Sequence, residues 1–483
     1  MLYFKKLNLL FFLITVTAFV SCKKNDVDPV ATVTDSTSVS YKSVNQWIYE
    51  TMGDIYFWSS TIPAQSNLDL TISPTDFFEK LIYQRTTTDR FSTITDDFNA
   101  LQNEFNGVST IFGISYSLSY LDDANSNIGL FLNLVVKGSP AEAAGLKRGD
   151  VIMKVNGTQL TEANYSTLLG NGETATFTLG TLNGTVFAAN GTTISVTKTV
   201  VTEDPVVFSS IIDKSTYGKK IGYIAYTQFI PGNTSDASKY DNELRQIFAN
   251  FKTNGVNELV LDLRYNGGGY ISSAETLASL IGKNISSSKV FYKEQWNEKY
   301  TAYWQKSNGA NALNYNFLTE NNNIGSSLSR VFVLTSNGTA SASELVINGL
   351  KPYMDVVTIG THTYGKNLFG SLISDDQNRW NWGMYIMLGQ TANANDQSDY
   401  GTVSGITPTY IVEDNVVPYK AFGDDNETLF KKALDVMGVP VSQNGRIAAT
   451  KKVNSVTNEI YRDNLHVSDK RMIKNTSLKL FNQ

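Results

Sequence analysis

Apolar and polar positions alternate in two different ways along residues 205–440. Short apolar runs bounded by turn residues predict strands, whereas apolar residues three or four positions apart predict helices. The expected order is strand 221–226, helix 240–254, strand 259–263, helix 271–281, strand 331–334, helix 342–350 and strand 356–359. Strands that alternate with helices form crossover units, so we predict an α/β core with a largely parallel sheet. Two polar and aromatic inserts, 292–325 and 385–404, interrupt this order.

The pattern differs on both sides of this core and predicts a multidomain chain. In residues 41–106, apolar side chains such as Trp47 and Ile48 fall at helical spacing, which predicts an N-terminal helical region. Residues 107–204 consist of strand-like segments separated by glycine and asparagine turns, as in a β-rich domain. Residues 441–483 hold eight Lys or Arg against three Asp or Glu, so we expect a basic, loosely packed C-terminal extension.

Residues 1–22 have the features of an export signal. Lysines at positions 5 and 6 precede an apolar run, 7–20, that is too short to span a membrane comfortably. The run ends at Cys22 in a segment that resembles the lipobox of bacterial lipoproteins, which implies a lipid anchor at this residue. A plain cleaved signal or a short membrane anchor is the alternative. Residues 23–40 are polar and rich in Ser, Thr and Asp, which predicts a flexible tether.

Composition excludes several classes of function. A formal net charge of −5, with no dominant basic face, argues against a nucleic-acid partner. Cys22 is the only cysteine, which precludes an internal disulfide and a cysteine-cluster metal site. Because the chain also has only two histidines, His362 and His466, we expect no metal site. The same scarcity leaves a serine nucleophile with few histidines that could act as its base.

Ser341 is the candidate nucleophile. It stands in Thr-Ala-Ser-Ala-Ser-Glu, where Ser-x-x-Glu fits a capping box at the start of the predicted helix 342–350. A helix cap is the ordinary role of such a serine. The same position, however, lies beside free backbone N–H groups and the positive end of the helix dipole, which stabilise developing negative charge on a reacting carbonyl oxygen.

Lys366 is the candidate base, and it follows Ser341 by 25 positions. A lysine next to a glycine is ordinarily a solvated surface residue. To act as a base it must lose its proton near neutral pH, so its pKa has to fall from about 10.4 to roughly 7–8, most simply through burial. A neutral lysine can activate a hydroxyl as histidine does elsewhere.

A nucleotide site is the competing interpretation of this region. Residues 360–366 fit the phosphate-loop pattern Gly-x-x-x-x-Gly-Lys, but Asn367 stands where a Ser or Thr should hold magnesium. Residues 367–373 also have the pattern of a strand, whereas a phosphate loop leads into a helix. A second glycine-rich turn occurs in Asp-Leu-Arg-Tyr-Asn-Gly-Gly-Gly at 262–269, and alone it is a generic anion-binding signal.

Residues 138–152 closely resemble the central signature of a PDZ domain. Gly-Ser-Pro-Ala-Glu-Ala-Ala-Gly-Leu-Lys-Arg-Gly-Asp-Val-Ile predicts a short helix, a Gly-Asp turn and a strand. PDZ domains bind extended chain ends by adding a strand to an exposed sheet edge. Phe112, Gly113 and Ile114 stand where the loop that holds the terminal carboxylate would lie. An ordinary strand entry is the alternative for these three residues.

Together these motifs resemble the C-terminal processing, or tail-specific, peptidases, which are serine-lysine endopeptidases with a PDZ domain ahead of the catalytic core. Four motifs occur in order over roughly residues 41–440. The resemblance implies that Ser341 is the nucleophile, that Lys366 is the general base, and that the backbone N–H groups of Gly268 and Ala342 form the oxyanion hole. It also implies an acyl-enzyme, no cofactor, and polypeptide substrates with accessible C-termini.

Two positions depart from that family. Many members carry Gln or Glu four residues after the lysine, where it helps to orient the amine, whereas this chain has Gly370. His362 and Ser371 are the candidates to hold Lys366 instead. Gly267 replaces a common proline, which is a milder change.

The sequence therefore predicts a serine endopeptidase of the cell envelope, held by a lipid anchor at Cys22. A lysine directly after this cysteine is typical of lipoproteins bound for the outer membrane. A catalytically weak or inactive peptide-binding lipoprotein of the same fold is the alternative, and Gly370 is its main support. A small-molecule carrier, similar to retinoid-binding modules on a related core, is disfavoured by the intact spacing of Ser341 and Lys366.

Overall fold

The computed structural model describes residues 40–121, 126–184, 186–441, 451–452 and 471–474. These residues belong to one compact unit, 40–483. The predicted export signal, most of the tether and Cys22 lie outside the described residues. Within the described part of the chain, no helix is both long enough and apolar enough to cross a membrane.

A six-stranded sheet forms the centre of the core, in the order β10-β11-β12-β16-β17-β20. Its strands are β10 Val206–Lys214, β11 Lys219–Tyr226, β12 Glu258–Asp262, β16 Arg330–Thr335, β17 Asp355–Gly360 and β20 Tyr410–Ile411. Only β10 pairs antiparallel to its neighbour, and the other strands run parallel. This confirms the predicted α/β core with a largely parallel sheet.

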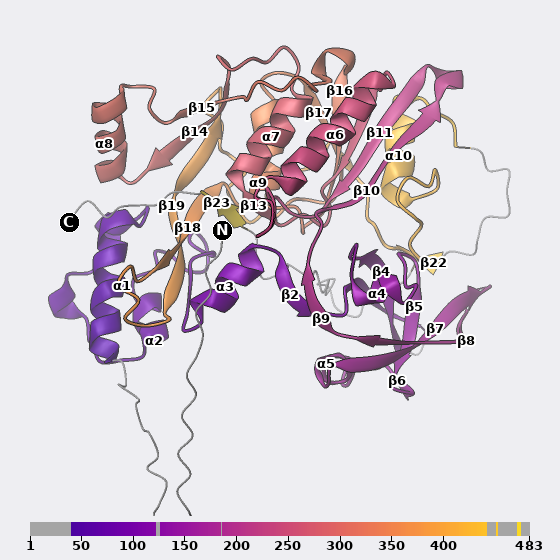
Figure 1. The fold of residues 1–483 in the computed structure, drawn as a ribbon, viewed down its shortest axis with the longest axis horizontal. Helices are drawn as coiled ribbons and strands as arrows, with labels where there is room; N and C mark the ends of the chain where they lie inside the picture. Colours follow the sequence, from indigo (N-terminus) through magenta and orange to yellow (C-terminus); the bar gives the residue numbers. More distant parts are fainter. Residues whose placement is uncertain (1–39, 122–125, 185, 442–450, 453–470, 475–483) are drawn as a thin grey trace, which may run out of the picture. The chain divides into compact units, whose positions relative to one another are not determined.

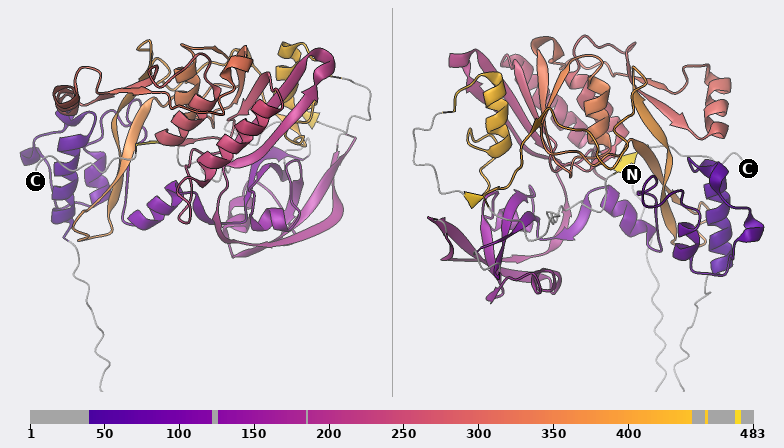
Figure 2. Two further views of the ribbon diagram at one scale, coloured as in Figure 1. Left: turned by 45° about the horizontal axis from the view of Figure 1, so that its top comes forward. Right: turned by 180° about the vertical axis from the view of Figure 1, so that it is seen from behind.

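Helices cover both faces of this sheet because successive strand residues point to opposite sides. Ile224 and Leu261 share one buried cluster with apolar residues of three helices, whereas Tyr223 and Val260 pack against a fourth. The three are α6 Lys239–Thr253, α7 Ile271–Ile281 and α9 Ala342–Leu350, and the fourth is α10 Thr428–Met437. Figures 1 and 2 show the strands lying between α10 and the α6–α7 pair. The predicted helices 271–281 and 342–350 coincide with α7 and α9.

The inserts that interrupt the α/β pattern contribute to a second sheet, in the order β13-β23-β18-β19-β14-β15, with β1 beside β19. Its strands are β13 Gly268–Tyr270, β23 Arg471–Ile473, β18 Leu368–Ser374, β19 Gly383–Asn393, β14 Val290–Trp296, β15 Asn314–Asn316 and β1 Thr93–Thr95. Helix α8, Glu298–Asn308, lies between β14 and β15 in sequence. The expectation of a loosely packed C-terminal extension is wrong for β23, because this segment pairs inside the sheet.

The N-terminal helical region packs into the same core. It contains α1 Tyr41–Ile55, α2 Pro74–Glu79, α3 Phe98–Phe105 and two short 3-10 turns, Ser59–Thr61 and Gln65–Asn67. Val44, Ile48 and Met52 of α1 are fully buried in the cluster that also holds α7 and α9. The backbone N–H of Phe57 donates to the carbonyl of Met387 in β19 (2.9 Å). This region therefore braces the second sheet.

A β-rich domain interrupts the chain between the helical region and the core. Its sheet has the order β3-β4-β5-β7-β8, with β6 beside β5, so β3 is an edge strand. Its elements are β3 Ile114–Tyr120, β4 Ile128–Val135, α4 Pro140–Ala143, β5 Val151–Val155, β6 Thr158–Gln159, α5 Tyr165–Gly170, β7 Thr174–Asn183 and β8 Val186–Thr197. The entering and leaving strands, β2 Val108–Ile111 and β9 Thr199–Thr202, pair antiparallel, and β21 Val416–Val417 pairs with β22 Lys451–Lys452.

Arg148 joins this β-rich domain to the core. Its guanidinium donates to the hydroxyl of Tyr265 and to the carbonyl of Lys420, both at 2.7 Å, and lies 3.3 Å from Glu427. Glu427 also pairs with Arg264, whose side chain is fully buried (2.6 Å). Burial opposes ionisation of Glu427, but the guanidinium groups of Arg264 and Arg148 outweigh it and hold the pKa of Glu427 below its usual value.

Candidate active site

Ser341 lies at the turn between β16 and the start of α9. Its backbone has φ 63° and ψ −111°, a conformation that residues other than glycine adopt only at a cost of about 1–3 kcal/mol. The side chain is fully buried, and its Oγ has no hydrogen-bond partner among the described residues. Strained serines at a strand-to-helix turn are typical of nucleophiles.

Glu344 brings Ser341 and Lys366 together. Its Oε2 accepts the backbone N–H of Ser341 (2.7 Å) and that of Lys366 (2.9 Å), so the two nitrogens lie no farther apart than the sum of these distances. Its Oε1 accepts from the N–H of Gly365 (2.8 Å) and from the hydroxyl of Thr363 (2.5 Å). Burial raises the pKa of the Glu344 carboxyl, and the hydrogen bonds oppose that shift. The sequence had indicated Glu344 only as a capping residue.

Lys366 is fully buried, as a lysine base requires. Its Nζ donates to the hydroxyl of Tyr385 in β19 (3.1 Å) and lies 4.8 Å from the ring centre of Phe91. The preceding residue, Gly365, has φ +84°, and a Cβ there would meet the carbonyl oxygen of Thr402 at 1.6 Å. The close passage of two backbone segments therefore requires glycine at position 365.

The two proposed oxyanion donors are placed by Asn266. Its carbonyl accepts from the N–H of Ala340 (3.1 Å) and the hydroxyl of Ser343 (3.0 Å), which joins the glycine-rich turn to the segment around Ser341. Its Oδ1 accepts the N–H of Gly268 (2.8 Å), so that donor must exchange partners before it can bind an oxyanion. Ala342 is the first residue of α9, where a backbone N–H has no intrahelical acceptor.

Neither predicted partner of Lys366 is its described contact. His362 is exposed, and its Nδ1 lies 3.0 Å from the carbonyl of Ser404. The hydroxyl of Ser371 faces the carbonyl of Leu372. At Gly370 a Cβ would meet the carbonyl oxygen of Ile386 at 2.5 Å, so a longer side chain there requires the two strands to move apart.

Comparison with known proteins identifies the family. Three family models match: the peptidase S41 N-terminal domain at residues 43–93, a PDZ domain at 131–179 and peptidase family S41 at 220–412. The solved structure of a Bacteroides fragilis protein assigned to the S41 proteases is 30% identical, with a TM-score of 0.69, and the match covers 81% of this chain and 97% of that protein. The chain belongs to peptidase family S41.

Curated proteins that this chain resembles more distantly are named C-terminal processing peptidases or proteases. The chloroplastic C-terminal processing peptidase of Tetradesmus obliquus is 27% identical over 274 residues, which are 55% of this chain and 53% of the relative. The carboxyl-terminal-processing protease of a Picosynechococcus species is 26% identical over 312 residues, 63% of this chain and 66% of the relative. The chain thus spans between about half and two thirds of the length of these two relatives.

The PDZ domain of this S41 chain has a tight loop before β3. Gly113 has φ +91°, and a Cβ there would meet the side chain of Ser139 at 2.1 Å. Phe112 is buried against Phe177, and the amine of Lys198 lies 4.9 Å from the centre of its ring. Ile114 begins β3, the edge strand. The predicted carboxylate loop therefore leads directly into a strand that has no paired neighbour on its outer side within this sheet, although its residues 114–119 are buried.

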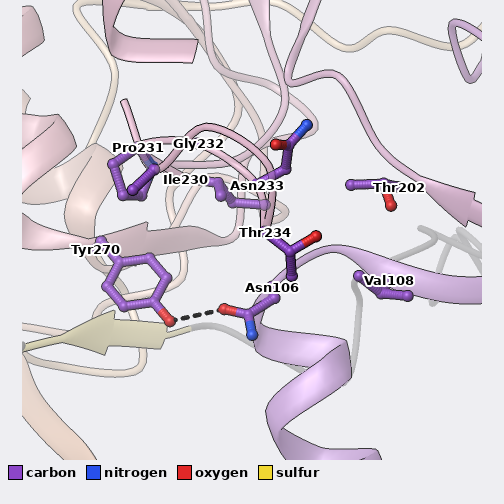
Figure 3. Close-up of a pocket in the computed structure, with 10 residues that line it drawn as sticks. Asn106, Val108, Thr202, Ile230, Pro231, Gly232, Asn233, Thr234 and Tyr270 are labelled. Atoms are coloured by element: carbon purple, nitrogen blue, oxygen red, sulfur yellow. Dashed lines mark hydrogen bonds between the residues drawn. The ribbon is translucent and has the colours of Figure 1, made fainter. Parts of the chain in front are cut away.

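A pocket of about 260 Å³ lies beside the glycine-rich turn of the S41 core. Figure 3 shows the ring of Tyr270, the last residue of β13, with its hydroxyl bonded to Asn106 (3.0 Å), and the loop of residues 230–234 above it. The lining residues are Asn106, Val108, Thr202, Ile230, Pro231, Gly232, Asn233, Thr234, Ala237 and Tyr270. Because β13 begins at Gly268, this pocket opens two residues from a proposed oxyanion donor.

Proposed function

We propose that this S41 chain is a serine endopeptidase that uses Ser341 as nucleophile and Lys366 as general base. The single observation that supports it most is that one oxygen of Glu344 accepts the backbone N–H groups of both the strained serine and the buried lysine. In the proposed reaction Ser341 Oγ attacks the carbonyl carbon of the scissile bond while Lys366 Nζ takes its proton. The lysine then protonates the leaving amine, and water hydrolyses the acyl-enzyme by the reverse transfer.

Burial is the reason to expect an uncharged Lys366. Removing an ammonium group from water costs several kcal/mol, and the aromatic faces of Phe91 and Tyr385 return only about 2 kcal/mol of cation–π attraction. A neutral amine has a lone pair that can accept the serine proton. The pH dependence follows: kcat/KM should rise with pH as the lysine deprotonates, and a flat profile from pH 6 to 9 would contradict a lysine base.

The test is cleavage of unfolded proteins with apolar C-termini by the chain from residue 23 onward. We expect cleavage by the parent and none by Ser341→Ala or Lys366→Ala. Ser326→Ala and Lys351→Ala remove the same groups from exposed positions and should cleave as the parent does. Equal cleavage by all five proteins would refute the dyad.

A non-catalytic peptide-binding lipoprotein remains the second candidate. Gly370 in place of the family's Gln or Glu favours it, and so does the Gly268 N–H, which is already bonded to Asn266. Under this alternative the same substrates bind to the parent chain and are recovered intact after long incubation. The two candidates therefore differ in one measurable product, the new amino terminus that hydrolysis creates.

We further propose that the PDZ domain recognises the C-terminal end of the substrate and that a lipid on Cys22 holds the protein at the outer membrane of the cell envelope. The position of β3 at the end of its sheet, directly after the loop of Phe112 and Gly113, supports the first part. The lipobox-like segment supports the second. Cys22→Ala should move the protein from the membrane fraction to the soluble fraction and abolish labelling by radioactive palmitate. Unchanged fractionation and labelling would remove the anchor from this proposal.

A further inference from the structure

The C-terminal segment supplies one strand of the second sheet, between β13 and β18. Arg471, Met472 and Ile473 pair in parallel with Gly268, Gly269 and Tyr270, residue for residue. On the other side Ile473 pairs with Gly370, and the N–H of Lys474 donates to the carbonyl of Gly370 (3.1 Å). Figure 1 shows the arrow of β23 beside the labels of β13 and β18.

Both neighbours of β23 begin at the candidate active site. β13 starts at Gly268, a proposed oxyanion donor, and β18 starts two residues after Lys366. All three strands run parallel. The amino-terminal end of β23, at Arg471, is therefore the end that lies at Gly268. We call the space that β23 occupies between β13 and β18 the slot. If another polypeptide took the place of β23 there, the residues before its paired segment would lie at the end of the sheet near Ser341 and Lys366.

Backbone pairing in the slot is short and independent of sequence, so selectivity must come from side chains. Ile473 is 4% exposed and belongs to the main apolar cluster of the core. Lys474 pairs with Glu294, donates to the hydroxyl of Tyr315 (2.6 Å) and lies 3.8 Å from the centre of that ring. An apolar side chain and the lysine after it are thus each received by a defined site.

The receptor for Lys474 is acidic and deeply buried. The Glu294 side chain has 0% exposure, and its other oxygen accepts from Trp296 Nε1 (2.8 Å). Glu275 lies nearby and accepts from the Tyr292 hydroxyl (3.0 Å), and burial raises the pKa of its carboxyl. Burial also lowers the pKa of Lys474, while Glu294 opposes that shift. A buried carboxylate beside a second carboxyl group is matched to a cation and disfavours an acidic side chain.

We infer that the slot between β13 and β18 is a binding site for an extended polypeptide in which an apolar residue is followed by lysine, and that residues 471–474 fill it in competition with substrate. This rests on the proposed function, because it makes the slot the substrate groove of the Ser341 site. The chain's own segment Met-Ile-Lys at 472–474 is the occupant in this structure.

A binding experiment tests the slot without turnover. The host is the full chain with Ser341→Ala, to block cleavage, and Lys474→Glu, which sets a second negative charge against Glu294 and empties the slot. The probe is a fluorescent peptide of residues 468–478. We expect saturable binding of this peptide to the host. The same peptide carrying Lys474→Glu should bind at least tenfold more weakly. The original peptide should also bind more weakly to a host that keeps Lys474. Equal binding of both peptides, or no binding, would contradict the proposal that the slot binds an apolar residue followed by lysine.

Turnover provides the second readout. With a peptide substrate, Lys474→Glu alone should lower KM severalfold, and the 468–478 peptide should then inhibit competitively. Lys431→Glu makes the same charge change on the exposed surface of α10 and should leave KM unchanged. Loss of cooperative unfolding in both Lys474→Glu and the milder Lys474→Met would show that β23 is only a structural strand. If the peptide binds but no variant cleaves a substrate, the proposed peptidase activity is contradicted and the proposed binding slot is retained.

Discussion

Lys366 is held by residues that its own segment does not contain. Tyr385 lies on β19 and Phe91 comes from the chain before β1, yet both contact the amine. The sequence indicates Ser341 and Lys366 because their local motifs are specific. It gives no local signal for Tyr385, which stands inside an insert expected only to be polar and aromatic. The sequence therefore suggests nearby residues such as His362, although position along the chain does not decide which side chains meet.

Tyr385→Phe tests whether this hydroxyl positions the amine. The variant keeps the ring that packs edge-on against Phe105 and loses the hydrogen bond to Lys366. Because a buried hydrogen bond of this kind is worth about 1–2 kcal/mol, kcat/KM should fall roughly tenfold. A positioning role should also move the basic limb of the pH profile. Tyr353→Phe deletes a half-buried hydroxyl bonded to Val290 and should leave that limb in place.

The raised pKa of Glu344 predicts that the free energy of unfolding depends on pH. Burial raises its pKa, so the folded chain holds this proton at a higher pH than the unfolded chain, whose carboxyl titrates near 4.5. The contribution to stability is complete below that pH and is lost as the pH rises through the folded pKa. Glu344→Gln does not titrate at this position. The free energy of unfolding of wild type minus that of the variant should therefore fall as the pH rises above about 4.5. A difference that grows with pH would contradict the buried carboxyl.

At the scale of elements, prediction succeeded where the pattern was long and local. α7 and α9 coincide with the predicted helices because their apolar residues repeat over several turns and glycine or serine stands at their ends. The strand β23 could not be predicted, because three residues in a polar, basic tail carry no periodic signal. Its place is fixed by partners about 100 and 200 residues away, Gly370 and Gly268.

The contacts of Arg148 with the core predict that replacing this residue lowers the free energy of unfolding. Arg148→Ala removes the hydrogen bonds to Tyr265 and Lys420 and one of the two cations of Glu427, so the free energy of unfolding should fall by about 3 kcal/mol. Arg148→Lys keeps the charge without the planar fork and should recover less than half of that loss. Urea denaturation measures both. A loss below about 1 kcal/mol for the alanine variant would show that the contact contributes little.

At the scale of the whole molecule, the PDZ domain and the catalytic core act on one substrate in the proposed function. The loop of Phe112 and Gly113 precedes β3, the terminal strand of the PDZ sheet, and in the proposed function this loop receives the substrate carboxylate. A peptide with a free C-terminus should therefore have a KM about tenfold lower than the same peptide with an amidated C-terminus, because charge-assisted hydrogen bonds of about 1.5–3 kcal/mol are lost. Equal KM values would place recognition elsewhere.

The left-handed backbone at Ser341 lowers the free energy of unfolding of the protein at the residue that supplies the nucleophile in the proposed function. Ser341→Gly relaxes φ 63° at no steric cost, so this variant should resist urea better than its parent, by about 1 kcal/mol or more. In the proposed function, this strain is the cost of placing the nucleophilic hydroxyl at the start of α9. A parent that proves as robust as its glycine variant would mean that this position carries no such penalty.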